Sequence, residues 1–188
     1  MRMFRTAAAL FVLAAAFPAA AQTPVSVPAF DSIELNGGGR VVVRHGARQS
    51  VTLVRGNLET TRFTVGRDGK LEIDACVRSC RDYDLLVEIV TPELDAVAIH
   101  GGGQIRAEGA FPRRDELAIG ISGGGTIDMT AIEADTVAAG INGGGSILAH
   151  ARDRLTAGIN GGGAVRYNGT PAVTAAIDGG GIVRKIGE

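Results

Sequence analysis

Apolar and polar residues alternate on both sides of a glycine triplet that occurs six times in the chain. Before the fourth triplet, Ala139 and Ile141 are apolar at two-residue spacing, and Ile147 follows two residues after it. Every copy shows the same arrangement. Because side chains alternate between the two faces of a β-strand, this period of two predicts one strand before and another after each triplet. The triplets begin at Gly37, Gly101, Gly123, Gly143, Gly161 and Gly179.

The triplets predict sharp corners, because glycine adopts positive φ without a steric penalty. Successive copies lie 64, 22, 20, 18 and 18 residues apart, so the last five form an array. We expect a second turn between triplets, at residues 133–135, 152–154 and 168–171. Units this short cannot bury an apolar face alone, whereas stacking them at about 4.8 Å would form a continuous core. The pattern therefore predicts an all-β solenoid of glycine-punctuated repeats.

The N-terminal part, residues 30–92, is less regular than the array of residues 93–188 but still alternates as strands. Asp68-Gly69 separates two of these strands and is typical of a hairpin turn. We interpret this part as the cap of the same stack, with a separate small β domain as the alternative. The strands are expected at residues 41–44, 51–54, 63–65, 71–73 and 85–90.

Residues 1–21 have the three parts of a secretory signal peptide. Arg2 and Arg5 precede an apolar stretch at residues 7–17, and small residues lead up to Ala21, after which we expect cleavage. The apolar stretch is shorter than the roughly 20 residues needed to cross a bilayer. The sequence therefore predicts export and a mature protein that does not span the membrane, with a linker at residues 22–29 and one domain at residues 30–188.

Composition and charge narrow the class of protein further. The 28 glycines, the absence of tryptophan and the many β-branched residues favour short strands and tight turns over helices. The 19 Lys and Arg residues nearly balance the 20 Asp and Glu residues, for a net charge of −1. Because nucleic acids select strongly basic surfaces, we do not expect a nucleic-acid partner.

Cys76 and Cys80 are the two cysteines of the chain. Export through an oxidising compartment favours a disulfide between them, with a structural role in pinning a short loop. A redox role is the weaker alternative, because the spacing differs from that of thioredoxin-like motifs. The three histidines lack the paired spacing of a zinc site, and the residues after each triplet do not follow the calcium-binding β-roll pattern. We therefore predict no metal, no cofactor and no catalytic residue.

A polar or turn-forming residue stands directly before each triplet, and in a stack these residues would form a column. The column offers either amide ladder bonds within the protein or polar contacts to a glycan, and we favour the structural role. Arg106, Arg166 and Arg184 occupy equivalent positions after their triplets, which leaves a carbohydrate-active enzyme as a minority hypothesis. The candidate column residues are Ser122, Asn142, Asn160 and Asp178.

Two identical runs carry a family resemblance. Ala-Gly-Ile-Asn-Gly-Gly-Gly occurs at residues 139–145 and again at 157–163, and Phe-Asp-Ser-Ile opens the domain at residues 30–33. With these runs, residues 30–186 resemble the head GIN domain family of autotransporter adhesin-like proteins. The resemblance implies a right-handed parallel β-helix-like fold, export to the cell envelope and an adhesive role, with no established catalytic residues.

Together these features predict an exported, non-enzymatic, adhesin-like binding or scaffold protein of the cell envelope. The alternatives are a carbohydrate-active β-helix enzyme and a purely structural envelope protein. The expected partner is a glycan or another cell-surface ligand, and pairing of exposed end strands leaves a homo-oligomer open. The expected location is periplasmic, cell-surface or secreted.

Overall fold

The structure of the protein is a computed structural model that describes residues 22–80 and 84–187. The described residues form fifteen strands and no helix, which confirms the all-β prediction. The strands are β1 (Thr23–Val25), β2 (Ser32–Gly37), β3 (Arg40–His45), β4 (Ser50–Arg55), β5 (Arg62–Val65), β6 (Lys70–Asp74), β7 (Leu86–Thr91), β8 (Ala96–Gly101), β9 (Gln104–Glu108), β10 (Arg114–Gly123), β11 (Thr126–Gly143), β12 (Ser146–Gly161), β13 (Ala164–Asn168), β14 (Ala172–Asp178) and β15 (Ile182–Lys185).

Each glycine triplet joins two strands at a sharp corner, as its sequence context predicts. The first glycine of every triplet has positive φ, from 101° at Gly37 to 130° at Gly123. The strands before the triplets form one row, here called the pre-triplet row: β2, β8, β10, the second halves of β11 and β12, and β14. The strands after them form the post-triplet row: β3, β9, the first halves of β11 and β12, β13 and β15.

Within each row, neighbouring strands pair in parallel and keep the triplets in register. Ile121, Ile141, Ile159 and Ile177 are successive partners along the pre-triplet row. The N-terminal part differs, because β4 pairs antiparallel with both β1 and β7, and β5 pairs antiparallel with β6. The fifteen-stranded sheet therefore has mixed strand orientation, and the predicted parallel solenoid is met only in part.

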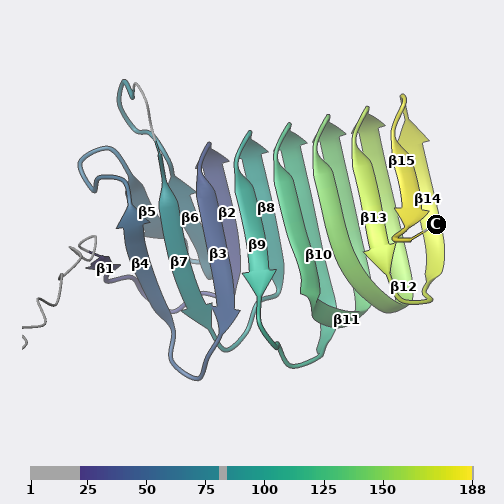
Figure 1. Cartoon of the computed structure of the whole chain (residues 1–188), viewed down its shortest axis with the longest axis horizontal. Coiled ribbons are helices and arrows are strands. Elements are labelled where there is room, and N and C mark those ends of the chain that lie inside the picture. Colours follow the sequence, from purple (N-terminus) through teal and green to yellow (C-terminus); the bar gives the residue numbers. More distant parts are fainter. Residues whose placement is uncertain (1–21, 81–83, 188) are drawn as a thin grey trace, which may run out of the picture.

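The two rows lie one in front of the other along the length of the molecule (Figure 1). Alternate side chains of both rows are buried in one hydrophobic cluster that extends from Phe30 to Val165. Each buried Ile, Leu or Val contributes about 1.5–3 kcal/mol relative to an exposed side chain. The cluster includes Leu71 and Ile89 of the N-terminal part as well as Ile141 of the array. Both parts of the domain thus share one core.

At two of the three predicted second turns, the chain passes from the post-triplet row to the pre-triplet row without leaving its strand. β11 and β12 bend between the two rows but stay in strand conformation through residues 133–135 and 152–154. Their pairing shifts register between Asp128 and Glu133 and again between Ala134 and Thr136. Those segments contain no glycine or proline, and their charges pair across neighbouring strands, as Arg152 Nε does with Glu133 Oε1 at 3.5 Å. The third turn is confirmed at residues 169–171, where Gly169 has a φ of 96°.

The two ends of the stack are built differently. At the N-terminal end, β1 lies within the segment 22–29 that we expected to be a linker, and it covers β4. At the same end, the hairpin of β5 and β6 extends the pre-triplet row, because β6 pairs with β2. Its turn lies at Asp68-Gly69 as predicted. At the C-terminal end, β14 pairs with β12 alone and β15 with β13 alone. The predicted signal peptide, residues 1–21, lies outside the described residues.

Cys76 and Cys80 form the predicted disulfide, with Cα atoms 6.2 Å apart. The bridge closes a loop directly after β6, where the N–H of Val77 donates a hydrogen bond to the carbonyl oxygen of Thr60 at 2.9 Å. A loop this short removes little chain entropy, so the chain-entropy model gives the bridge about 2 kcal/mol at most. The bridge therefore lies in the cap of the stack, on the loop that follows β6.

Candidate functional site

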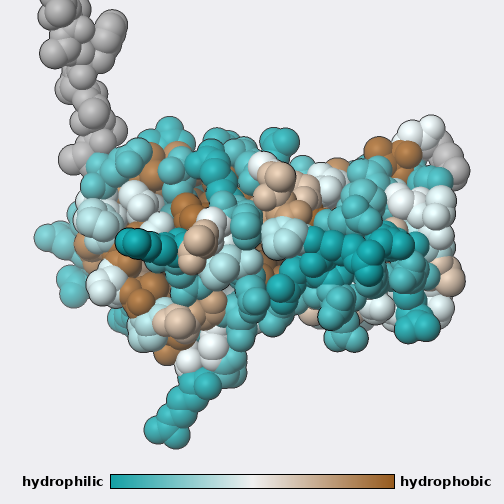
Figure 2. All heavy atoms as spheres, turned by 90° about the horizontal axis from the view of Figure 1, so that it is seen from below, coloured by the Kyte–Doolittle hydropathy of each residue, from teal (hydrophilic) through white to brown (hydrophobic). Residues whose placement is uncertain are grey.

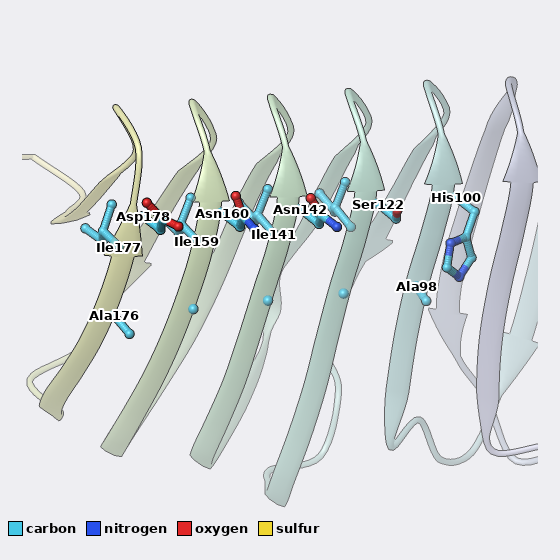
Figure 3. Close-up of a pocket in the computed structure, with 14 residues that line it drawn as sticks. Ala98, His100, Ser122, Ile141, Asn142, Ile159, Asn160, Ala176, Ile177 and Asp178 are labelled. Atoms are coloured by element: carbon cyan, nitrogen blue, oxygen red, sulfur yellow. The ribbon is translucent and has the colours of Figure 1, made fainter.

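The outer face of the pre-triplet row carries the predicted polar column. Ser122 pairs with Asn142, Asn142 with Asn160 and Asn160 with Asp178, so the four predicted residues stand side by side on successive strands. All four side chains are exposed. Figure 3 shows the column extended by His100 at its N-terminal side. Asn36 precedes His100 in the same register, and there the Asn36 amide donates to Asp74 Oδ1 at 3.1 Å.

A second column lies two residues before the polar one and consists of the smallest residues. Ala98, Gly120, Gly140, Gly158 and Ala176 are register partners on β8, β10, β11, β12 and β14. Because these residues have little or no side chain, they form the floor of a groove that crosses the strands (Figure 3). The groove has a volume of about 640 Å³, and the polar column forms one of its walls.

The opposite wall continues the run of small residues. Ala118, Ala138 and Thr156 line a second, adjoining hollow of about 440 Å³ on the same face, which shares the glycine floor. Parallel strands lie about 4.8 Å apart, so floor and walls repeat at that spacing along the groove. This face is therefore a long, shallow surface with a regular pattern of methyl, Cα–H and amide groups.

Charged groups close the groove at its N-terminal end. Lys70 Nζ lies 2.8 Å from Glu34 Oε2 and 3.4 Å from Glu72 Oε1, and His100 Nε2 lies 3.7 Å from Glu34 Oε2. The hydrogen bond to Glu34 raises the pKa of Lys70 above its ordinary value, so its ammonium group stays charged at neutral pH. Glu34, Lys70 and His100 come from β2, β6 and β8, and pairing of these strands brings them together.

The floor glycines differ physically from the triplet glycines. A Cβ at Gly140 or Gly158 would meet no atom within 4 Å, and neither residue has positive φ. A Cβ at Gly143, in contrast, would lie 2.5 Å from the carbonyl oxygen of Gly123. The triplet glycine is required by the backbone, whereas neither strand geometry nor packing requires a glycine in the floor. Sequence reasoning missed this column, although its signal is a glycine three residues before three of the triplets.

The outer face of the post-triplet row is charged and self-paired. Arg106 and Arg184 fall in one register with Arg166, but Asp128 and Leu148 interrupt the column between them. Arg106 Nε lies 3.7 Å from Asp128 Oδ2. Exposed ion pairs of this kind contribute about 0–1 kcal/mol each. The arginines thus share their column with a partner of opposite charge, and do not form a continuous basic stripe.

Among the described residues, no group of three or more His, Cys, Asp or Glu side chains is arranged to hold a metal ion. The same part of the chain contains no helix long and apolar enough to cross a membrane. The groove on the pre-triplet row is the candidate site.

Fold and groove together define the class: an all-β repeat protein with a glycine-floored groove on an exposed sheet face. The chain belongs to the family described as "Putative auto-transporter adhesin, head GIN domain", which it matches over residues 29–115 and 113–171. The resemblance drawn from the repeated runs is thereby confirmed. No curated protein sequence matches the chain.

A solved structure shares the fold at low sequence identity, and two further matches are weaker. A putative adhesin from Bacteroides fragilis NCTC 9343 is 16% identical with a TM-score of 0.54, over 88% of this chain and 96% of that one. A putative adhesin from Parabacteroides distasonis ATCC 8503 is 18% identical with a TM-score of 0.47, over 88% and 96%. A putative lipid binding protein from the same strain is 16% identical with a TM-score of 0.39, over 88% and 96%.

Proposed function

We propose that the protein is a non-enzymatic, adhesin-like binding protein of the cell envelope that holds an extended glycan along the groove of the pre-triplet row. The observation that carries this proposal is the presence of Gly140 and Gly158 in mid-strand, where nothing in the fold requires them. Glycine in a strand interior costs roughly 0.5–1 kcal/mol relative to alanine. A common reason for such a glycine is the close approach of a ligand to the backbone.

A glycan suits this groove because it combines apolar ring faces with hydroxyl groups. The floor of Cα–H and methyl groups would contact the ring faces, and the amides of Asn142 and Asn160 would bond to hydroxyls from the wall. The groove is open along its length and crosses five strands, so it favours an extended chain over a compact molecule. Amide and hydroxyl groups at about 4.8 Å intervals would serve a ligand with repeating hydroxyls.

The finer features of fold and location are part of the same proposal. We infer a right-handed coil for the repeat array, because connections between parallel strands of one sheet are right-handed in about 98% of cases. Family membership and the Cys76–Cys80 disulfide favour a cell-envelope or surface location, since disulfides persist in oxidising compartments. The signal peptide predicted at residues 1–21 would deliver the chain there.

Filling the groove is expected to abolish binding without destabilising the fold. In Gly158→Leu, the new side chain projects into open space above the floor, so the free energy of unfolding should change by about 0.5 kcal/mol or less, while retention on an array of immobilised glycans should be lost. Gly162→Leu is the matched control, because a Cβ there also meets no atom within 4 Å but lies at the corner, outside the groove. It should bind as the wild type does.

Three outcomes of this experiment would contradict the proposal. They are a wild-type protein that retains no glycan, release of reducing ends from the array, and equal binding by the two leucine variants. The second outcome would identify a carbohydrate-active enzyme instead. Urea denaturation of each variant separates loss of binding from loss of fold.

The polar wall is tested separately by Asn160→Ala. If Asn160 bonds to a ligand, retention on the array should fall by about five- to thirtyfold, as expected for one or two lost hydrogen bonds, with the urea midpoint unchanged. If the amide instead supports the stack, the midpoint should fall and binding should follow it. Thr126→Ala, on the outer face of the post-triplet row and outside the groove, is the control for a general effect of truncation.

A further inference from the structure

The sheet has four edge strands within the described residues, and three of them carry features that prevent pairing. β1 is three residues long and contains Pro24, and β5 has four residues with Arg62 at its start. β15 has four residues, of which Arg184 and Lys185 are charged. Short length, proline and charge are the usual means by which proteins protect a sheet edge. β14 has none of these over residues 172–177, and its one charge is the terminal Asp178.

β14 also exposes residues that occupy core positions. Its partner in register is β12, where Leu155 and Ile159 are 0% and 3% exposed. The matching residues of β14, Val173 and Ile177, are 40% and 44% exposed. Figure 2 shows hydrophobic residues at the end of the molecule that carries β14 and β15. This end is therefore a cross-section through the hydrophobic core, with no further strand to cover it in the described chain.

Half of the backbone N–H and C=O groups of β14 point away from the sheet. In β10 the N–H of Ala118 donates to Asp95 O on the side of β8, and the register of the row makes Thr174 the equivalent residue of β14. Alternate residues of a strand direct both backbone groups to the same side. The N–H and C=O groups of Val173, Ala175 and Ile177 therefore point away from β12, toward the free edge.

We propose that two copies of the protein associate through antiparallel pairing of β14 with β14, centred on Ala175. The core-facing residues Val173, Ala175 and Ile177 form a nearly palindromic set, with a β-branched residue two positions on either side of Ala175. Reversal about Ala175 places Val173 opposite Ile177 of the second copy and Ala175 opposite itself. A two-fold pair makes every such contact twice, and no charge of β14 opposes a like charge.

This arrangement stops at two copies. Within the described residues each copy has one unprotected edge. That edge is used in the pair, so these residues leave no open edge for a fibre. Pairing of a seven-residue strand, together with the core layer behind it, would bury on the order of 400–500 Å² of accessible surface per copy. This area is at the low end for specific interfaces. We therefore expect a dissociation constant in about the micromolar range.

Pairing also has a consequence for the groove. Directly opposed residues of paired strands project to the same face of the sheet. Because Thr174 and Ala176 project to the groove face, the grooves of the two copies would lie on one face of a continuous sheet. A dimer would thus present two binding surfaces in one direction, which raises avidity for a multivalent ligand. The dimer itself does not depend on the proposed glycan function.

Sedimentation velocity on the full mature chain tests the dimer. The wild type is expected to shift from monomer to twice the monomer mass as its concentration rises through the micromolar range. Ala175→Pro removes the outward N–H at the centre of the pair while leaving the bonds to β12, so it should stay monomeric. Ala175→Val keeps that N–H and should still dimerise. Circular dichroism of each variant reports whether the strand content is intact.

A thiol cross-link tests the register directly. Ala175→Cys is expected to form a disulfide-linked dimer under mild oxidation, because the cysteine of one copy lies opposite the same cysteine of the second copy. Ala172→Cys lies on the same strand, but in the pair it is about 20 Å from the cysteine at position 172 of the second copy. It should therefore remain unlinked. A monomer at all concentrations up to about a hundred times the expected dissociation constant would overturn the proposal. Species larger than a dimer, or equal cross-linking of both variants, would overturn it as well.

Discussion

Gly143→Ala is expected to lower the free energy of unfolding by about 3 kcal/mol or more. Gly143 has a φ of 128°, a region that residues with a Cβ rarely adopt. The added Cβ would also lie 2.5 Å from the carbonyl oxygen of Gly123, and that oxygen accepts a hydrogen bond from Gly144. Neither the backbone nor the oxygen can move without disturbing the stacked corner before it. Urea denaturation measures the loss.

Gly144→Ala is the matched control for this substitution. A Cβ at Gly144 would meet no atom within 4 Å, and its φ is not positive. The variant should therefore differ from the wild type by about 0.5 kcal/mol or less. Equal destabilisation by the two alanines would mean that the triplet acts only through chain flexibility, and the stacked-corner explanation would be wrong.

Ile141→Asp is expected to destabilise the protein by about 4 kcal/mol or more. Ile141 is 3% exposed and lies between Ile121 and Ile159 in the core of the pre-triplet row. The substitution removes the apolar burial of an isoleucine and places a carboxyl group where no hydrogen-bond partner is available nearby. Because each strand pair stacks on the next, neighbouring repeats should lose protection together, which limited proteolysis would detect.

The adjacent substitution Asn142→Asp supplies the comparison. Asn142 follows Ile141 on the same strand but faces solvent on the groove side. The same carboxyl group should change stability by about 0.5 kcal/mol or less at that position. If Ile141→Asp proves as protease-resistant as the wild type, the continuous core between the rows is not what holds the repeats together.

The strands and corners could be predicted because their causes are local. The alternation around Ile141 and the positive φ of Gly143 follow from the strand period and from the absence of a Cβ, both of which are visible in a few residues. At residues 133–135 and 152–154 the chain changes rows but stays paired as a strand, and the reason is non-local. Their charges resemble a turn in the sequence, but in the fold Arg152 pairs with Glu133 on the neighbouring strand.

The candidate site was predicted only in part. The polar column of Asn142 and Asn160 follows from its fixed position before the triplets, and the structure places those residues side by side. Its role stays a prediction. The groove floor was missed, because a sequence does not distinguish a glycine that the backbone needs, such as Gly143, from one that nothing in the fold needs, such as Gly158.

Taken by itself, the sequence determined the all-β class, the six corners, the inward-facing residues of each strand and the Cys76–Cys80 bridge. These depend on side-chain period, glycine conformation and a separation of a few residues. Only the tertiary structure decided which strands are neighbours outside the repeat array, because the backbone groups that pair strands are the same in almost every residue. That pairing capped one end with antiparallel strands, left β14 open at the other, and joined five separate strands into one groove.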